Sequence, residues 1–131
     1  MNNLDIIFNS VLSKITPSLD DIKLINDIIL KLKNFLEINA RKLNIKYTKI
    51  EPQGSTGIKQ TQLKGDFDID LFIGIDYNLF KQKYTGMSKN QLKKELKKFF
   101  FSLCNRWILQ SLHSDEFNNP HLLYAEHPYV K

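Results

Sequence analysis

The stretch from Gly54 to Ile73 constrains this chain more than any other part of the sequence. It begins with small residues, continues with lysines and ends with two aspartates ahead of an apolar run. The small residues are Gly54, Ser55 and Gly57, and the lysines are Lys59 and Lys64. Small residues let backbone N–H groups approach an anion such as a phosphate closely. The stretch therefore predicts an anion-binding turn followed by a strand.

Asp68 and Asp70 flank Ile69 on the predicted strand, which we place from Phe67 to Ile75. Side chains at positions i and i+2 of a strand point to the same face. The two carboxylates are expected to stand about 7 Å apart along that face. Close carboxylates repel each other unless a cation lies between them. Mg²⁺ suits this position, because it takes oxygen ligands and is commonly shared between carboxylates and substrate phosphates. On an apolar strand, an unpaired charge would also be costly.

Composition bounds the fold and the environment of the chain. With 131 residues, of which 42% are hydrophobic, we expect a single domain with a real core. The net charge of +5 is compatible with nucleic acid or nucleotide partners but does not require them. Cys104 is the single cysteine, which excludes an internal disulfide and a cysteine-rich zinc site. We expect no signal peptide and no membrane segment, and a cytoplasmic location.

Periodicity and capping signals predict three helices. Apolar residues at helical spacing predict one over residues 4–14 and a long one over residues 19–43. Ser18 is expected to cap the long helix with Asp21 in a capping box, and Asn44 to end it. Ser88 and Gln91 form a second capping-box pattern at the start of a helix over residues 89–112.

The strands are predicted from alternation and from β-favouring residues. Residues 45–50 alternate apolar and polar side chains, which indicates a half-buried strand. We expect that strand to pair antiparallel with residues 67–75. Residues 76–87 are interpreted as a polar surface loop, and residues 122–127 as a third strand whose ladder Pro128 disturbs. The fold class predicted from this order is α+β.

Lysines are concentrated on the predicted helices. The helix over residues 89–112 begins with five of them: Lys89, Lys93, Lys94, Lys97 and Lys98. Two interpretations stay open, a solvated surface and a path for RNA. Lysines near the start of a helix oppose its dipole, which favours a role other than helix stability.

Several segments together resemble a known enzyme family. Gly54-Ser55, Thr61-x-Leu63-Lys64-Gly65 and Asp68-Ile69-Asp70-x-Phe72 resemble the signature of the polymerase-β-like nucleotidyltransferase superfamily. Ile15-Thr16-Pro17-Ser18 near the N-terminus and the seven residues from Tyr124 to Val130 near the C-terminus are similar to segments of the archaeal-type, class I CCA-adding tRNA nucleotidyltransferases. The likeness covers nearly the whole chain, and the Ala-Glu-His-Pro-Tyr part is its more specific pointer.

The resemblance implies a five-stranded palm and a template-independent polymerase that adds C, C and A to the 3′ end of tRNA from CTP and ATP. By the match, Gly54 and Ser55 would contact the nucleotide phosphates, and Lys59 would be the basic residue that follows this serine. Asp68 and Asp70 would be catalytic carboxylates and ligands of two Mg²⁺ ions. The loop between Ser55 and Asp68 is one residue longer than the family's spacing, and ungapped counting would put Ile58 in place of Lys59.

The family's third carboxylate comes from a strand that follows the His-Pro-Tyr segment, and the sequence ends before it. Residues 1–131 are therefore expected to be a palm domain that ends ahead of this strand, with an incomplete mixed or antiparallel sheet flanked by long helices. Residues 121–131 would then be a strand without a neighbour. We expect a second polypeptide or a C-terminal part to complete the site and to supply the tRNA-binding domains. The alternatives are a minimal nucleotidyltransferase that modifies a protein or small molecule, and a non-catalytic nucleotide- or RNA-binding module.

Overall fold

The computed structural model describes residues 2–57, 62–114, 116–125 and 127–131. The chain is of mixed α+β class, as predicted, and its contacts divide it into two compact units. One unit comprises Met1–Lys31 with Lys49–Gly74, and the other Leu32–Thr48 with Ile75–Lys131. No helix in the described part of the chain is long and apolar enough to cross a membrane. The prediction of a single palm domain stays a prediction.

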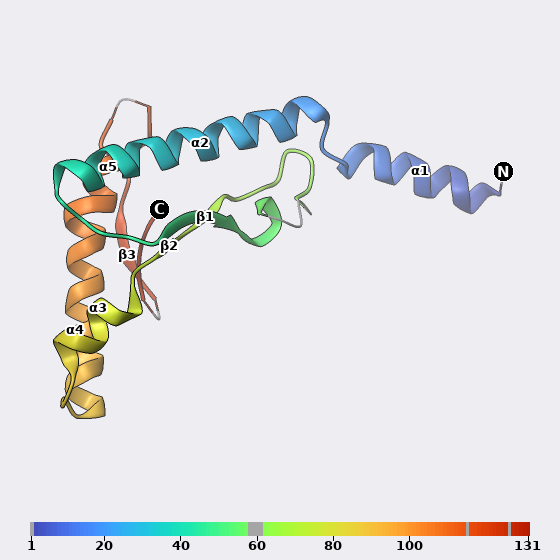
Figure 1. Ribbon diagram of the computed structural model, residues 1–131. Helices are drawn as coiled ribbons and strands as arrows, with labels where there is room; N and C mark the ends of the chain where they lie inside the picture. The colour runs from blue at the N-terminus through green and yellow to red at the C-terminus, as the bar shows by residue number, and fades with distance from the viewer. Residues whose placement is uncertain (1, 58–61, 115, 126) are drawn as a thin grey trace. The chain divides into compact units, whose positions relative to one another are not determined.

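The first unit contains helix α1 (Asn3–Ile15), the start of helix α2 (Leu19–Lys42) and a strand pair. Strands β1 (Lys49–Gln53) and β2 (Asp70–Gly74) pair antiparallel, as Figure 1 shows. The pairing direction was predicted correctly. Among the described residues of this unit, the buried apolar side chains are Ile25, Ile29 and Ile50.

The second unit is built on one long helical segment. Helix α4 (Lys89–Leu103) continues through the π-helical turns of η2 (Cys104–Leu109) into α5 (Gln110–Leu112). Trp107 is fully buried, and its indole N–H donates to the Leu36 carbonyl at 2.8 Å. Its ring lies against Tyr47, with 5.5 Å between centroids. The second half of the helix predicted over residues 89–112 therefore packs on α2 and on the loop that follows α2.

The two predicted capping boxes are confirmed. The Ser18 N–H donates to the Asp21 carboxylate at 2.8 Å, and the Asp21 N–H donates to the Ser18 hydroxyl at 3.1 Å. Ser88 and Gln91 make the same reciprocal pair ahead of α4. Asn44, predicted to end α2, has a positive φ of 53° just after it. Local chemistry thus sets these helix boundaries.

The predicted bounds of the strand over residues 45–50 are wrong. The strand β1 begins only at Lys49. The Ile45 N–H donates to the Ala40 carbonyl at the end of α2, at 2.8 Å, and Tyr47 packs on Trp107. Ile45 therefore helps to end α2 and Tyr47 packs in the core, although their alternation indicated a strand. The strand over residues 67–75 is likewise shorter, because β2 begins at Asp70.

The polar loop predicted over residues 76–87 is wrong, because it contains helix α3 (Tyr77–Tyr84). The Asp76 carboxylate caps this helix by accepting from the Asn78 N–H at 2.8 Å. Phe80 packs on α4, where its ring centroid lies 4.5 Å from that of Phe99. Gly86, with φ of 86°, follows the helix end. The cap at Asp76 was the signal that identifies the helix.

The C-terminal segment is a hairpin, not a strand without a neighbour. Strands β3 (Leu122–Tyr124) and β4 (Pro128–Val130) pair antiparallel with each other. Pro128 opens β4 instead of disturbing β3, which suits a residue without an N–H donor. The described residues therefore form two separate two-stranded sheets, where the resemblance implied a five-stranded one.

The capping box of α2 makes a pH dependence testable. The pKa of Asp21 is lowered, chiefly because the Ser18 N–H donates to its carboxylate, and next because of the Ser18 hydroxyl. Because this pKa is lowered, the cap stabilises the folded chain fully at pH values above the ordinary aspartate pKa of about 4. The stabilisation is lost as the pH falls through the lowered pKa. Carboxyl NMR should give Asp21 a midpoint below the ordinary value, and Ser18→Ala should raise it. A midpoint at or above the ordinary value would contradict the cap.

Candidate functional site

The candidate site lies at one end of the β1–β2 pair. Gln53, the last residue of β1, is directly opposite Asp70, the first residue of β2. The turn η1 (Gly54–Thr56) follows Gln53 without an intervening residue. The Gly-Ser turn and the second aspartate of the pair are therefore neighbours in space, although the loop between them is long in sequence.

Gly54 makes the closest approach in the site. Its φ of +68° is a conformation that residues with a side chain rarely adopt. A Cβ at this position would lie 2.9 Å from Asp70 Oδ2, closer than such atoms normally come. Gly57 is restricted in the same way by the β1 backbone, since its Cβ would lie 2.8 Å from the Pro52 carbonyl oxygen. Two glycines thus let the turn fold onto the strand pair.

The first aspartate is tied to the same turn through the backbone. Thr56 is buried, and its hydroxyl donates to the Asp68 carbonyl at 3.1 Å. The Gly57 N–H donates back to the Gly54 carbonyl at 3.3 Å and closes the turn. The structure therefore brings Gly54, Asp68 and Asp70 together around one short turn.

The aspartates themselves are exposed, and so is Ser55. The expected cost of burying charge on an apolar strand therefore does not apply here, and that part of the sequence argument is wrong. Asp68 lies two residues ahead of β2, so strand geometry alone does not fix the relation of its side chain to that of Asp70. What distinguishes the pair is its contact with the turn.

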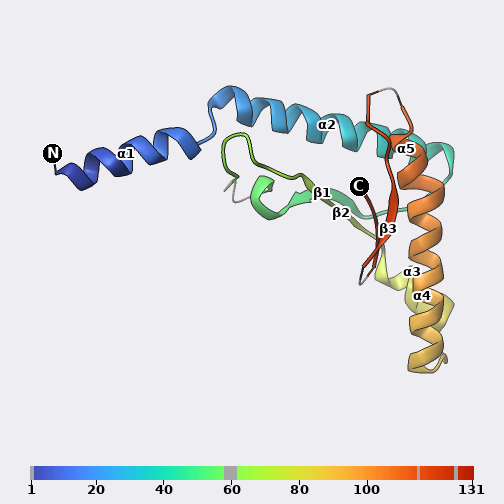
Figure 2. The same cartoon turned by 180° about the vertical axis from the view of Figure 1, so that it is seen from behind.

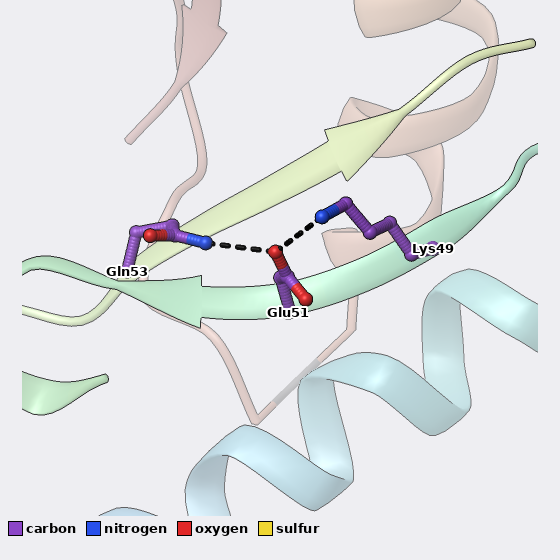
Figure 3. Close-up of polar contacts among 3 residues, drawn as sticks. All are labelled: Lys49, Glu51 and Gln53. Atoms are coloured by element: carbon purple, nitrogen blue, oxygen red, sulfur yellow. Dashed lines mark hydrogen bonds and ion pairs between the residues drawn. The ribbon is translucent and has the colours of Figure 1, made fainter. Parts of the chain in front are cut away.

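A row of polar side chains lies along β1, as Figure 3 shows. Glu51 Oε1 accepts from Lys49 Nζ at 2.7 Å and from Gln53 Nε2 at 2.8 Å. Directly opposed residues of an antiparallel pair share a face, so Gln53 lies on the face of Asp70. The Glu51 contact holds the Gln53 amide in place there. Sequence reasoning missed Gln53, because the strand register that places it opposite Asp70 cannot be read from the sequence.

The loop between the turn and β2 contains the lysines predicted to serve the site. Lys59, predicted to bind the nucleotide, lies outside the described residues. The Lys64 N–H donates to the Ile15 carbonyl at 2.8 Å, and its charge contributes to lowering the pKa of Asp21 at the start of α2. Lys64 is therefore directed toward the helices of its unit. Gln62 is buried, and its side-chain oxygen has no hydrogen-bond partner within the described ranges.

The donor set suits a hard cation. Asp68 and Asp70 supply carboxylate oxygens only, which Mg²⁺ prefers, and Mg²⁺ is usually held by one or two carboxylates together with substrate phosphates. Within the described ranges, no group of three or more histidine, cysteine or acidic residues is arranged to hold a metal. The two aspartates therefore fit a site in which a nucleotide supplies further ligands.

Comparisons of the chain with protein-family models, curated protein sequences and solved structures find no match. The geometry and the residue pattern therefore carry the functional argument.

The contact between Gly54 and Asp70 predicts an effect of one added methyl group. Gly54→Ala should destabilise the fold by about 1–2 kcal/mol through its positive φ and also push the Asp70 carboxylate away. Gly65→Ala is the matched control, because Gly65 has a φ of +71° with nothing within 4 Å of its Cβ position. Chemical denaturation should show similar losses for both variants, whereas only Gly54→Ala should weaken metal-dependent nucleotide binding. Equal binding by the two variants would contradict the assignment.

Proposed function

We propose that this chain is the N-terminal, palm-bearing part of a tRNA nucleotidyltransferase that adds CCA to tRNA 3′ ends from CTP and ATP. The observation that carries the proposal is the approach of Gly54 to the Asp70 carboxylate, with 2.9 Å between the Cβ position and Oδ2. It supports a phosphate-binding turn placed directly against metal-binding carboxylates. Residues 54–72 and 124–130 resemble segments of the class I CCA-adding enzymes, and this resemblance is the reason for proposing tRNA, CTP and ATP as the substrates.

Each residue of the site has a role in this proposal. Asp68 and Asp70 would hold Mg²⁺, which when bound neutralises phosphate charge and makes a hydroxyl more acidic. The Gly54–Thr56 turn presents backbone N–H groups and the Ser55 hydroxyl to the nucleotide phosphates. Lys59 would be the basic residue that follows Ser55 in the sequence. Gln53, whose amide donates to Glu51, would provide a fixed polar group beside Asp70.

A second polypeptide is part of the proposal. The family that the residues resemble uses a third carboxylate and separate tRNA-binding domains, which we propose come from a further chain or a C-terminal part. Transfer chemistry at a two-metal site depends strictly on the complete ligand geometry. This chain alone is therefore expected to bind nucleotide weakly and to catalyse no transfer.

Incorporation of labelled CTP and ATP into tRNA that lacks its CCA end tests the proposal. The assay is run with this chain alone, with the candidate completing polypeptide alone and with both. Transfer only by the pair supports the proposal. Transfer of nucleotide to a protein or small molecule by this chain alone would instead favour a minimal nucleotidyltransferase. Nucleotide binding without transfer in every combination would favour a non-catalytic module.

A further inference from the structure

One face of α4, in the second unit, concentrates positive charge. It carries Lys93, Lys94, Lys97 and Lys98, which are exposed and follow one another at helical spacings. Residues three and four apart are neighbours on a helix surface, so these side chains form one continuous patch.

An exposed aromatic residue lies within this patch. Phe101 is 49% exposed and stands four residues after Lys97 and three after Lys98. The neighbouring Phe99 instead packs on Phe80 of α3. Phe101 therefore offers an exposed ring among cations, while Phe99, two residues before it, packs on α3.

A second aromatic residue orders one of the lysines. Lys97 Nζ lies 4.4 Å from the centroid of the Tyr124 ring, which belongs to β3 beside the α4–η2 helix (Figure 2). Lys98 Nζ lies 3.2 Å from Glu95 Oε1 at the edge of the patch. A cation held over a ring loses less side-chain freedom when it meets a ligand. We refer to Lys93, Lys94, Lys97, Lys98, Phe101 and Tyr124 as the α4 patch.

We infer that the α4 patch binds single-stranded nucleic acid. Cations that track a backbone combined with an aromatic platform for bases are the pattern by which single strands are bound without sequence preference. A duplex would keep its bases stacked and would not use Phe101. An acidic peptide would pair with the lysines but would gain little from an exposed ring. The occupant that uses both features is a single strand with free bases.

This inference goes beyond the proposed function, because the patch needs neither nucleotide nor metal. It holds whether or not the chain takes part in nucleotidyl transfer. Binding is therefore measured with EDTA present and nucleotide absent, so that the candidate metal and nucleotide site takes no part in it. A failure of the α4 patch and a failure of the candidate site are thereby separated.

The test is fluorescence anisotropy of the full chain with a labelled twelve-nucleotide uridine oligomer at several salt concentrations. For single strands, the plot of log affinity against log salt falls with a slope of about −0.7 for each phosphate neutralised. Lys94→Ala/Lys97→Ala should make that slope shallower by about 1.4. Phe101→Ala should lower the affinity about fivefold or more without changing the slope. Lys42→Ala/Lys131→Ala, which removes equal charge elsewhere on the second unit, should change the slope little.

Other outcomes would overturn the inference. They are an unchanged slope for the α4 lysine variant, an equal change for the control pair, or no effect of Phe101→Ala. Displacement of the oligomer by poly-glutamate as readily as by unlabelled single strand would identify an acidic protein as the partner. Equal affinity for a duplex of the same length would remove the role of Phe101. Circular dichroism of each variant checks that α4 stays helical.

Discussion

Under the proposed function, replacing Asp70 with asparagine is expected to lower nucleotide incorporation into tRNA by about a thousandfold when the chain is joined by the completing polypeptide. The carboxylate is exposed at the start of β2 and lies against Gly54, where the phosphates of a nucleotide would enter. Asparagine keeps the size of the side chain and removes its charge. Loss of one anionic metal ligand at a transfer site removes several kcal/mol of transition-state stabilisation, and a thousandfold corresponds to about 4 kcal/mol.

Asp66→Asn is the matched control for this prediction. Asp66 is an exposed aspartate in the same segment, next to Gly65. Its backbone N–H donates to the Leu63 carbonyl at 3.3 Å. Its substitution should leave incorporation within about twofold of the wild type, and both variants should unfold at similar denaturant concentrations, because exposed substitutions cost little. An Asp70→Asn enzyme as active as the Asp66→Asn enzyme would remove Asp70 from the site.

The largest effect on stability is expected for Trp107→Ala, at about 3–5 kcal/mol. Trp107 is fully buried, its N–H donates to the Leu36 carbonyl, and its ring lies against Tyr47. The substitution removes the contacts of η2 with Leu36 of α2 and with Tyr47 of the following loop. Because the effect approaches the whole stability of a small domain, most of the second unit should unfold together. Denaturation followed by circular dichroism measures the loss.

Trp107→Phe separates packing from hydrogen bonding. Phenylalanine retains an aromatic ring against Tyr47 but has no donor for the Leu36 carbonyl, so a smaller loss than for alanine is expected. Leu123→Ala, at a side chain that is 39% exposed on β3, is the control and should cost less than either. A loss below about 1 kcal/mol for Trp107→Ala would contradict the central position of this residue.

Local signals in the sequence predicted the helices well, because their boundaries depend on neighbouring residues. Ser18 with Asp21 and Ser88 with Gln91 satisfy N–H groups within one turn, so the pattern and the structure coincide. The α+β class follows from the same order of elements. The contact of the Gly54 turn with Asp70 could be anticipated only as a consequence of pairing two strands, whose direction was predicted and whose register was not.

The strands were less predictable, because tertiary contacts decide them. Tyr47 alternates correctly for a strand, yet its ring packs on Trp107, which is distant in sequence. Gln53 comes opposite Asp70 because of the register in which β1 and β2 pair, with Lys49 opposite Gly74. Helix α3 was missed because the polar composition of residues 76–87 outweighed the cap at Asp76. For Tyr47 and Gln53 the deciding contact lies outside the window that a local pattern covers, whereas the cap at Asp76 lies within it.

The central claim is that the Gly54 turn and the two aspartates form one metal and nucleotide site. Paramagnetic broadening of backbone amide NMR signals by a small amount of Mn²⁺, with CTP present, measures this directly on the chain itself. The claim predicts broadening centred on residues 53–56 and on the segment from Asp68 into β2, with the directly paired part of β1, reversed by EDTA and absent in the Asp68→Asn/Asp70→Asn variant. Broadening that is equally strong in that variant, or that falls elsewhere on the chain, would contradict it.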